Sequence, residues 1–362
     1  MRERLPLSLS GAPVCFPQQT HSLPSQVHFA LTPPHRIETS AGLSYTAPMN
    51  ASPLVSVGIP TYNRPSLLRS RLINVLSQTY RNLNVIVSDN ASTDPEVERV
   101  CLEFAALDTR VRYIKRETNI GAPANFSYVV TLAVSDFFVW AADDDEWEPD
   151  FVERCVNGIG DAQLFCLGME LKYLRTGKTE GLDLPDLNAV DGVDVNLPKF
   201  LANTQPNMVY GLHRLDALKS FMIKNVNFDL WDVALLYDAV VNRGITVQPG
   251  VGYRAGIPGD SYAVWTFGKP GSEQKFHYGR FLRSLAGSTK RASGVVGAMH
   301  RARVGYQALS MAIDLISHLT KTFPDKARFS HRIVSEAKIP QRAASWRYRW
   351  WLVRRKVRSL TE

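Results

Sequence analysis

The stretch Val55-Ser-Val-Gly-Ile-Pro-Thr-Tyr-Asn-Arg64 joins a short β-branched run to a polar turn, and it decides the fold of the first half of the chain. The apolar run at 54–59 is typical of a buried strand that ends at Pro60. Pro65 then opens a segment whose apolar residues recur every three or four positions, as in a helix. The alternation continues along the chain. We expect further strands at 84–88, 111–114 and 137–141, and helices at 66–76, 95–107 and 122–133.

Strands that alternate with helices of this length predict βαβ units and a parallel sheet, so the fold class is α/β. Such a sheet is covered on both faces, which explains why its strands are apolar along their whole length. Beyond residue 150 the pattern is less regular. We expect a helix at 151–157, a strand at 164–171, a loop at 175–198, a helix at 232–242, a long loop at 250–275 and a mostly helical stretch at 276–318.

Composition limits the function classes. The 362 residues are 45% hydrophobic and 21% charged, which is ordinary for a globular protein. The net charge is +8, but residues 345–362 carry +5 of it, so the remainder is too weakly basic to predict binding to nucleic acid. The first 53 residues hold eight of the 21 prolines and are expected to form a flexible leader. The four cysteines lack metal-site spacing and are expected to be reduced and buried.

Polar residues follow each of the first four strands. Ligands of a doubly wound sheet lie outside the carboxyl ends of its strands, so these four turns predict one polar rim. The last turn contains the acidic triplet Asp143-Asp144-Asp145 directly after an apolar strand. Adjacent carboxylates repel one another unless a cation compensates them, and Mg²⁺ or Mn²⁺ is commonly held by one or two carboxylates together with substrate phosphates. The alternative is a solvated acidic turn before the next helix.

Five motifs in order resemble the family 2 glycosyltransferases. They are Val55–Arg64, Leu76-Ser-Gln-Thr-Tyr80, Val87-Ser-Asp-Asn-Ala-Ser-Thr-Asp94, Asn119-Ile-Gly121 and the triplet at 143–145. The resemblance covers about residues 53–160. It implies a GT-A fold with a Rossmann-like, mostly parallel mixed sheet flanked by helices, followed by a helical C-terminal region. It also implies four segments: the leader 1–53, a nucleotide-sugar-binding half at 54–160, an acceptor-binding half at 161–275, and the helical region 276–362.

The resemblance also implies roles for the rim residues. Thr61, Tyr62 and Arg64 would wrap the nucleotide, with Tyr62 stacking on the base and Arg64 pairing with phosphate. Asp89 would contact the base or the ribose. Three further residues complete this set. Asn119 would line the donor site, Asp145 would bind the metal, and Asp143 would hold the metal or the ribose. Pro123-Ala-Asn-Phe126 stands where the family often has an arginine, so the resemblance implies no arginine contact to the donor from that turn.

Inverting transfer needs a general base on the acceptor side. In the family this aspartate often follows a glutamate before a helix, and Trp231-Asp232 is the nearest match, with Trp231 replacing the glutamate. Asp229 is a second candidate, and a helix-capping role for Asp232 is the structural alternative. We assign no role to His213 or His277. The aromatic loop 256–265 is expected to be either a lid over the acceptor or a buried turn.

The tail places Trp346, Trp350, Val353 and Val357 on one helical face, with arginines mostly opposite. This pattern is typical of an interfacial anchor on an anionic membrane surface, the alternative being a helix packed on the domain. With no apolar run long enough to span a membrane, we expect a cytoplasmic protein that is peripheral on the inner face of the cell membrane.

These expectations combine into a metal-dependent hexosyltransferase. It would move a sugar from a nucleotide-diphosphate sugar to a glycan or a lipid-linked acceptor in cell-surface polysaccharide synthesis, using Mg²⁺ or Mn²⁺. Two alternatives remain open at this point. One is a sugar-phosphate nucleotidyltransferase, which wants a glycine-rich loop after the first strand. The other is an inactive scaffold at the membrane surface.

Overall fold

The structure is a computed structural model that describes residues 52–222, 230–257 and 278–292. The expected leader, except for residues 52 and 53, and the basic tail lie outside the described residues. Asp229, Cys15, His277 and most of the expected lid loop lie outside them as well. Within the described part, no helix is long and apolar enough to cross a membrane.

A nine-stranded sheet has the order β3-β2-β1-β4-β8-β6-β9-β5, with β7 beside β6. The predicted strands β1 to β4 pair in parallel, and β6 also pairs in parallel with β9. The other pairs, which involve the shorter strands β5, β7 and β8, are antiparallel. The strands are β1 Val55–Thr61, β2 Leu83–Asp89, β3 Val111–Lys115, β4 Phe137–Trp140, β5 Glu146–Trp147, β6 Leu164–Tyr173, β7 Thr179–Leu182, β8 Leu212–Arg214 and β9 Ile245–Ile257.

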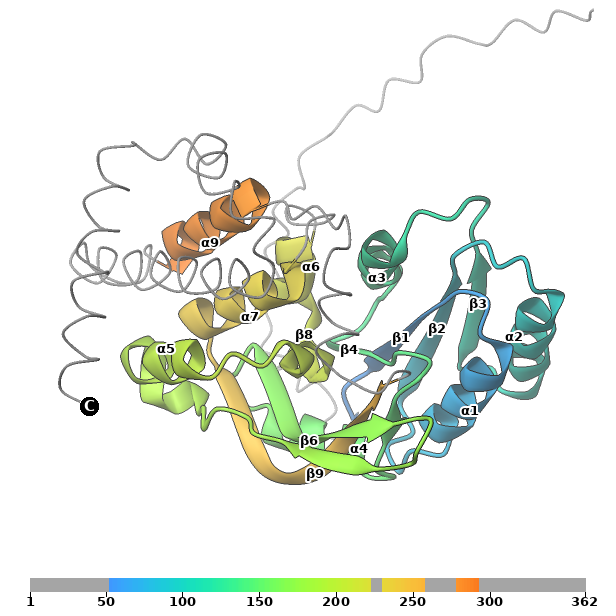
Figure 1. Ribbon diagram of the computed structural model, residues 1–362, viewed down its shortest axis with the longest axis horizontal. Helices are drawn as coiled ribbons and strands as arrows, with labels where there is room; N and C mark the ends of the chain where they lie inside the picture. Colours follow the sequence, from blue (N-terminus) through green and yellow to red (C-terminus); the bar gives the residue numbers. More distant parts are fainter. Residues whose placement is uncertain (1–51, 223–229, 258–277, 293–362) are drawn as a thin grey trace, which may run out of the picture. The chain divides into compact units, whose positions relative to one another are not determined.

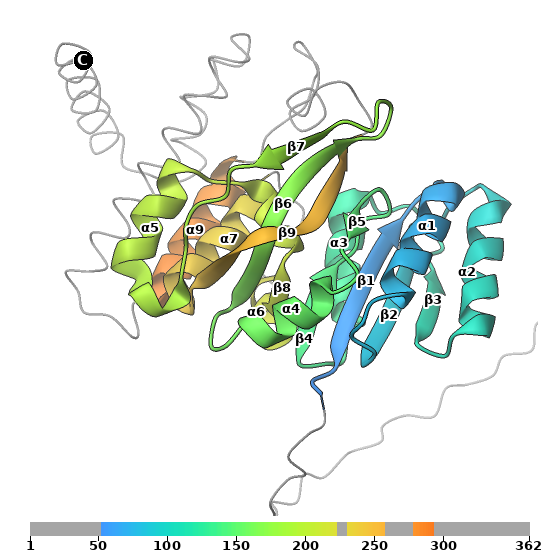
Figure 2. The same ribbon diagram turned by 90° about the horizontal axis from the view of Figure 1, so that it is seen from below.

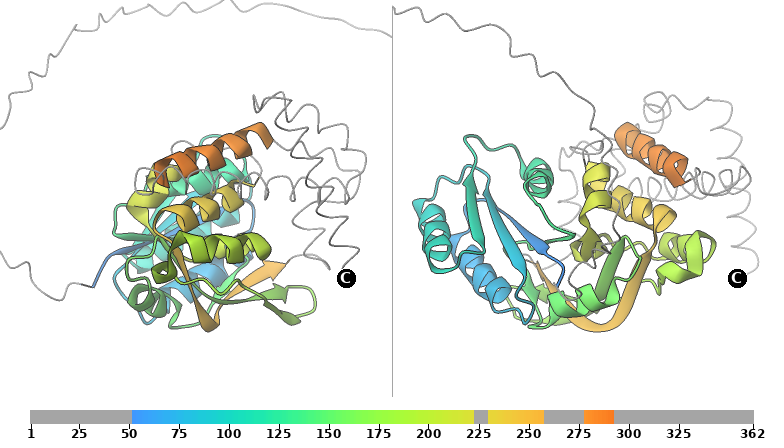
Figure 3. Two further views of the ribbon diagram at one scale, coloured as in Figure 1. Left: turned by 90° about the vertical axis from the view of Figure 1, so that its left-hand side faces the viewer. Right: turned by 180° about the vertical axis from the view of Figure 1, so that it is seen from behind.

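Helices cover both faces of the first strands: α1 and α2 lie on one face of β1 to β3, and α3 lies on the other (Figure 1). The second half adds α7, which packs against both α5 and α9, and the three helices lie together (Figure 2). Figure 3 shows from two further sides the helices around β1 to β3 and the helices of the second half. The α-helices are α1 Pro65–Leu76, α2 Pro95–Leu107, α3 Ala122–Thr131, α4 Phe151–Gly158, α5 Gly192–Ala202, α6 Leu215–Met222, α7 Trp231–Asn242 and α9 Tyr278–Ala292, and the 3₁₀ turns are η1 Ala189–Asp191 and η2 Pro206–Tyr210.

Local chemistry explains why the predicted helices begin where they do. Pro65 and Pro95 occupy the first turns of α1 and α2. A backbone N–H at this position has no partner within the helix, so proline can stand there without loss of a hydrogen bond. Asp94 caps α2 by accepting from the Glu96 amide at 2.9 Å. One strand boundary differs from the prediction, because β1 continues through Pro60, which pairs with Ser88 of β2. The longer strand places Thr61 at the very end of β1, next to Asp89.

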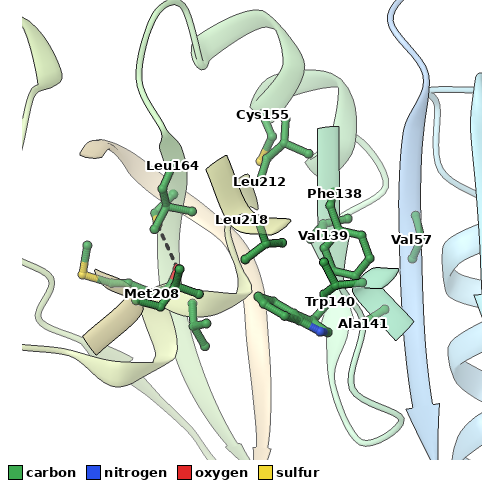
Figure 4. Close-up of a cluster of buried hydrophobic side chains, with 14 of the residues drawn as sticks. Val57, Phe138, Val139, Trp140, Ala141, Cys155, Leu164, Met208, Leu212 and Leu218 are labelled. Carbon is green, nitrogen blue, oxygen red and sulfur yellow. Dashed lines mark hydrogen bonds between the residues drawn. The ribbon is translucent and has the colours of Figure 1, made fainter. Parts of the chain in front are cut away.

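Strand β4 runs through the middle of the core (Figure 4). Phe138 and Trp140 are fully buried and pack edge to face at 5.1 Å between ring centroids. Gly58 on the neighbouring strand makes room for Phe138, since a Cβ there would lie 2.5 Å from the ring. The carboxyl end of β4, where the acidic triplet begins, is therefore held by tight packing.

Two expectations for the second half are wrong. The segment 175–198 is not a loop, because it contains β7, η1 and the start of α5. The loop expected from residue 250 begins later, because β9 continues to Ile257. Strand β9 pairs with β6 across a bulge near Gly168, which lets the long strand bend back toward the first half of the chain.

Side chains of α1 fix the backbone that follows the acidic triplet. Asn74 bonds both backbone groups of Trp147: its Oδ1 accepts from Trp147 N at 3.0 Å, and its Nδ2 donates to Trp147 O at 2.9 Å. One turn later, Gln78 donates to Glu148 O at 2.8 Å and accepts from Val152 N at 3.1 Å. These bonds join α1 and the turn that follows it to the whole segment from β5 to α4.

The two hydrogen bonds of the Gln78 side chain, to Glu148 O and from Val152 N, form a clamp that gives the first prediction. Gln78→Ala should lower the free energy of unfolding by about 1–3 kcal/mol, because it leaves two backbone groups without their partner in the interior. Gln78→Glu keeps an acceptor for Val152 N but loses the donor and places a carboxylate at a completely buried position, so its loss should be larger. Chemical denaturation of both variants measures the order. Equal stability of Gln78→Ala and the wild type would show that the clamp is dispensable.

Candidate active site

The rim expected at the carboxyl ends of the strands brings Thr61, Arg64, Asp143 and Asp144 into direct contact. Asp143 accepts from the Thr61 hydroxyl at 2.9 Å and from Arg64 Nη1 at 2.9 Å, on different carboxylate oxygens. The same Arg64 nitrogen donates to Asp144 at 3.0 Å. A single guanidinium nitrogen therefore bridges two carboxylates. Arg64, expected to pair with phosphate, pairs here with the triplet.

Asp145 faces away from that group, toward β9. Its two carboxylate oxygens accept from the Tyr253 hydroxyl and from the Gly256 amide, the latter at 3.0 Å. Gly256 passes so close to the triplet that a Cβ there would lie 1.9 Å from Asp144 O. Only glycine allows this approach. The roles of Tyr253 and Gly256 could not be read from the sequence, because the glycine-rich segment that contains both is typical of a loop.

The triplet carries more negative charge than its surroundings neutralise. Burial, and then repulsion by Asp144, raise the pKa of Asp143, while Arg64 and Thr61 act in the opposite direction. Burial raises the pKa of Asp145 to about 8, Asp144 adds to the shift, and Arg71 opposes it. The site therefore favours an additional positive charge or a proton.

Arg71 is a fully buried cation on α1, directly beneath the triplet. Its guanidinium stacks over the Trp147 ring at 3.9 Å and donates to Asn74 Oδ1 at 2.7 Å and to Asp145 O at 3.3 Å. Its Nε and Nη2 have no hydrogen-bond partner in the structure. Burial lowers the pKa of Arg71 to about 10, and Asp145 acts against this shift. A buried arginine had no signal in the sequence, because an arginine in an amphipathic helix is normally exposed.

Asp89 lies at the end of β2 as predicted, and its side chain is completely buried. One carboxylate oxygen accepts from Ser92 N at 2.8 Å, and the other accepts from the Tyr113 hydroxyl at 3.0 Å. Burial, followed by the charge of Asp89, raises the pKa of Tyr113. In this arrangement Asp89 holds the shape of the turn after β2.

Two asparagines join the three neighbouring turns of the rim. Asn63 Oδ1 accepts from Thr93 N at 2.8 Å, which links the turn after β1 to the turn after β2. Asn90 donates to Asn119 Oδ1 at 2.9 Å and accepts from Ile120 N at 2.9 Å, which adds the turn before α3. Asn63 and Ala91 both have positive φ, at 54° and 61°. The left-handed Ala91 is strained, as is common at functional sites. Beside these bonds, Tyr62 is 41% exposed.

Aromatic rings connect the triplet to the start of α7. Trp231 contacts Trp140 at 5.6 Å and Phe126 at 6.1 Å between ring centroids. Trp140 lies three residues before Asp143, so the expected base Asp232 begins its helix near the rim. Asp232 lies in the first turn of α7, and the N-cap position belongs to Leu230. Asp232 Oδ1 accepts from Val233 N at 2.8 Å. Tyr210 continues the aromatic contacts, stacking on Tyr253 at 5.5 Å.

Other titratable side chains are structural. His213 is buried against Trp140, and its Nε2 lies 2.7 Å from Val209 O. Burial lowers the pKa of His213 to about 4, so the ring is neutral. Cys101, Cys155 and Cys166 are buried free thiols, as predicted, and burial raises the pKa of each. Asn125 anchors α3 by bonding Ser88.

A metal at this rim would take its ligands from the carboxylate oxygens of the triplet. In the described ranges, no three side chains of His, Cys, Asp or Glu converge as a ready-made cage. The triplet offers carboxylate oxygens, which are hard ligands, and a cationic nitrogen of Arg64 already bridges two of them. Mg²⁺ and Mn²⁺ suit this arrangement, because one or two carboxylates plus substrate phosphates suffice for them.

The family model described as glycosyl transferase family 2 matches residues 56–186. An uncharacterized glycosyltransferase of Rickettsia bellii is 34% identical over 165 residues, which are 45% of this chain and 21% of that protein. The putative colanic acid biosynthesis glycosyl transferase WcaA of Escherichia coli is 35% identical over 102 residues, covering 28% of this chain and 36% of that protein. The chain thus spans about a fifth to a third of these relatives.

The fold also occurs among solved structures. S. aureus TarS 1–349 in complex with UDP-GlcNAc has a TM-score of 0.52 and 16% sequence identity, over 72% of this chain and 73% of that chain. At this identity the similarity concerns the fold. The match extends into the second half of the chain, and together with the sheet order it confirms the predicted GT-A architecture.

The close approach of β9 to the triplet gives the second prediction. Gly256→Ala should lower the free energy of unfolding by about 1–3 kcal/mol, because the new methyl group collides with the Asp144 carbonyl. Gly181→Ala on β7 is the matched control, since its Cβ would meet no atom within 4 Å. Urea denaturation compares the two. Similar stability of both variants would mean that the triplet and β9 are not in contact.

The buried carboxylate of Asp145 gives the third prediction. Its pKa is raised in the folded chain, so the wild type loses stability as pH rises from the unfolded value, about 4, to about 8. Asp145→Asn removes this titration. Its melting temperature relative to the wild type should therefore increase between pH 5 and pH 8 and level off above. Differential scanning calorimetry across this range measures it, and parallel pH profiles would contradict it.

Proposed function

We propose a reaction for this chain on the premise that it belongs to the family 2 glycosyltransferases. The reaction moves a sugar from a nucleotide-diphosphate sugar to a hydroxyl of a glycan or a lipid-linked acceptor, with inversion at the anomeric carbon. The observation that carries the proposal is the Thr61–Asp143–Arg64–Asp144 contact at the carboxyl ends of β1 and β4. It places hard oxygen ligands and an exchangeable cation on the polar rim of the sheet.

The donor would bind along this rim. Tyr62, exposed on the turn after β1, stacks on the base, and Asn119 lines the same side. Asp89 contacts the base or ribose, or acts through the turn that it shapes with Ser92 and Tyr113. TarS, which shares the fold, is a UDP-GlcNAc-binding protein, so UDP-sugars are the first donors to test.

Asp143 would hold a Mg²⁺ or Mn²⁺ on the side that now faces Arg64, and Asp145 would join it as a second ligand by turning from β9 toward the rim. When bound, such a cation stabilises the negative charge of the leaving diphosphate. Thr61 orients Asp143 through its hydroxyl. In the free protein, Tyr253 and Gly256 hold Asp145 toward β9. Arg64 pairs with the diphosphate.

Asp232 accepts the proton of the attacking hydroxyl. Trp231 at the start of α7 contacts Trp140 at the end of β4, near the rim. Asp232 is half-buried, so its carboxylate is partly exposed to solvent. The similarity to WcaA favours a polysaccharide as the product. A location on the cytoplasmic face of the membrane suits a lipid-linked acceptor and is part of the same proposal.

A donor panel tests the reaction. UDP-, GDP-, CDP- and dTDP-sugars are incubated with the protein, with Mn²⁺ or with a chelator, and release of nucleoside diphosphate is measured. We expect release from one nucleotide class. Release of pyrophosphate from a nucleoside triphosphate and a sugar phosphate would instead indicate a nucleotidyltransferase. Absence of nucleoside diphosphate release from every donor would support an inactive scaffold.

The base assignment gives the fourth prediction. Asp232→Asn should lower turnover by roughly 10²–10⁴-fold and leave donor binding unchanged, because the amide keeps the shape and the contact to Val233 N but accepts no proton. Turnover and nucleotide affinity are measured separately. Asp229→Asn is the matched control. Loss of turnover in Asp229→Asn alone would move the base to Asp229, and full activity of both variants would place it elsewhere.

A further inference from the structure

Arg64 occupies the position that a cation would take between two carboxylates. Its Nη1 lies 2.9 Å from Asp143 Oδ1 and 3.0 Å from Asp144 Oδ2. Both carboxylates are largely buried, with side-chain exposures of 6% and 8%, so they need a compensating charge in the free protein. Arg64 supplies it. Without this contact the two neighbouring carboxylates would repel each other with no opposing charge on their outer side.

The position of the Arg64 side chain allows it to move away from Asp143 and Asp144. It is 43% exposed and belongs to the turn between β1 and α1, at the solvent edge of the rim. Ion pairs with an exposed partner contribute little net stability, so the exchange of Arg64 for another cation costs little. Asp143 would stay in place, because Thr61 holds its other oxygen. Departure of Arg64 therefore uncovers Oδ1 of a carboxylate that is already oriented.

Arg71 differs from Arg64 on each of these points. It is fully buried, stacked on Trp147 and bonded to Asn74. It approaches the triplet from the core side, through the carbonyl of Asp145. A guanidinium without a route to solvent cannot exchange. The triplet thus has one fixed cation beneath it and one exchangeable cation at its outer edge.

We infer that Arg64 is a resident cation of the free protein that a divalent metal displaces, and that the displaced guanidinium moves to the donor diphosphate. The inference rests on the metal site of the proposed function. A metal bound at Asp143 Oδ1 would repel the guanidinium that now donates to the same oxygen, which favours departure of Arg64. A diphosphate offers the arginine a new anionic partner of matching bidentate geometry. Metal and nucleotide should therefore strengthen each other's binding, with Arg64 as the link.

The consequence is a change of opposite sign in two affinities. Removal of Arg64 takes away a competitor of the metal, so Arg64→Ala should bind Mn²⁺ alone more tightly than the wild type, by roughly three- to tenfold. It also takes away a diphosphate partner, so the same variant should bind nucleoside diphosphate more weakly in saturating Mn²⁺. A residue that only stabilises the rim would weaken both.

The experiment measures binding of Mn²⁺ alone by electron paramagnetic resonance, and of UDP, GDP, CDP and dTDP in saturating Mn²⁺ by calorimetry. Arg64→Lys keeps the charge and should stay near the wild type for Mn²⁺. Arg69→Ala is the matched control, because Arg69 lies on α1 and pairs with Glu103, away from the triplet. Melting temperatures confirm that each variant folds.

Tighter Mn²⁺ binding and weaker diphosphate binding by Arg64→Ala, with Arg69→Ala unchanged, would support the inference. Equal or weaker Mn²⁺ binding by Arg64→Ala would overturn it and leave the metal site itself intact. Absence of Mn²⁺ binding to the wild type and to Arg64→Ala would overturn both the inference and the metal in the proposed function. Asp143→Asn identifies the site, because it should abolish Mn²⁺ binding in either background.

Discussion

Repulsion among three consecutive carboxylates at the end of a buried strand is the constraint on which the rest of this site depends. Asp143, Asp144 and Asp145 follow β4, which tight packing holds in the core. The chain cannot separate the charges by moving the strand, so it separates them by direction. Asp143 and Asp144 face Arg64, and Asp145 faces Tyr253 and Gly256. Each direction brings a different part of the chain to the triplet.

The C-terminal half of the described chain takes part through β9. This strand pairs with β6 over most of its length and also meets β5, the short strand directly after the triplet. Arg254 on β9 pairs with Glu146 of β5 at 3.7 Å and with Glu170 of β6 at 2.9 Å, which ties β5, β9 and β6 together by charge. On the other side, Asn74 of α1 and Gln78 just after α1 hold the same segment. The acidic segment is therefore fixed from two sides by elements more than 150 residues apart in sequence.

The first half of the fold could be predicted from sequence, because its signals are local. Apolar strands, prolines at helix starts and the Asp94 cap each specify one element within a few residues. The second half offers weaker signals. Strand β8 has three residues, and α5 contains Pro198 in its interior, so neither has a clear period. Strand β9 contains three glycines and a proline, a composition typical of loops, and pairing with β6 overrides it.

The candidate site could be predicted in its residue types and only partly in its contacts. The positions of Thr61, Arg64, Asp89 and Asp143 at strand ends follow from the rule for parallel sheets. The partner of each side chain does not, because it depends on how turns fold onto one another. Asn63 and Asn90 illustrate this: they join three turns through side-chain bonds, and nothing in their neighbours distinguishes them from ordinary turn residues.

The two arginines next to the triplet have different roles: Arg71 stabilises the buried carboxylates, and Arg64 can exchange with another cation. Without an arginine beneath it, the site would lose most of its charge compensation whenever the divalent cation left. The buried carboxylates would then destabilise the fold. Arg71 opposes this loss, since burial and stacking on Trp147 hold it beside the Asp145 carbonyl. Arg64 is then free to change partners, because the fold does not depend on it alone. The unpaired Nε and Nη2 of Arg71 are the energetic cost of this arrangement, and they mark Arg71 as a residue kept for its charge rather than for its hydrogen bonds.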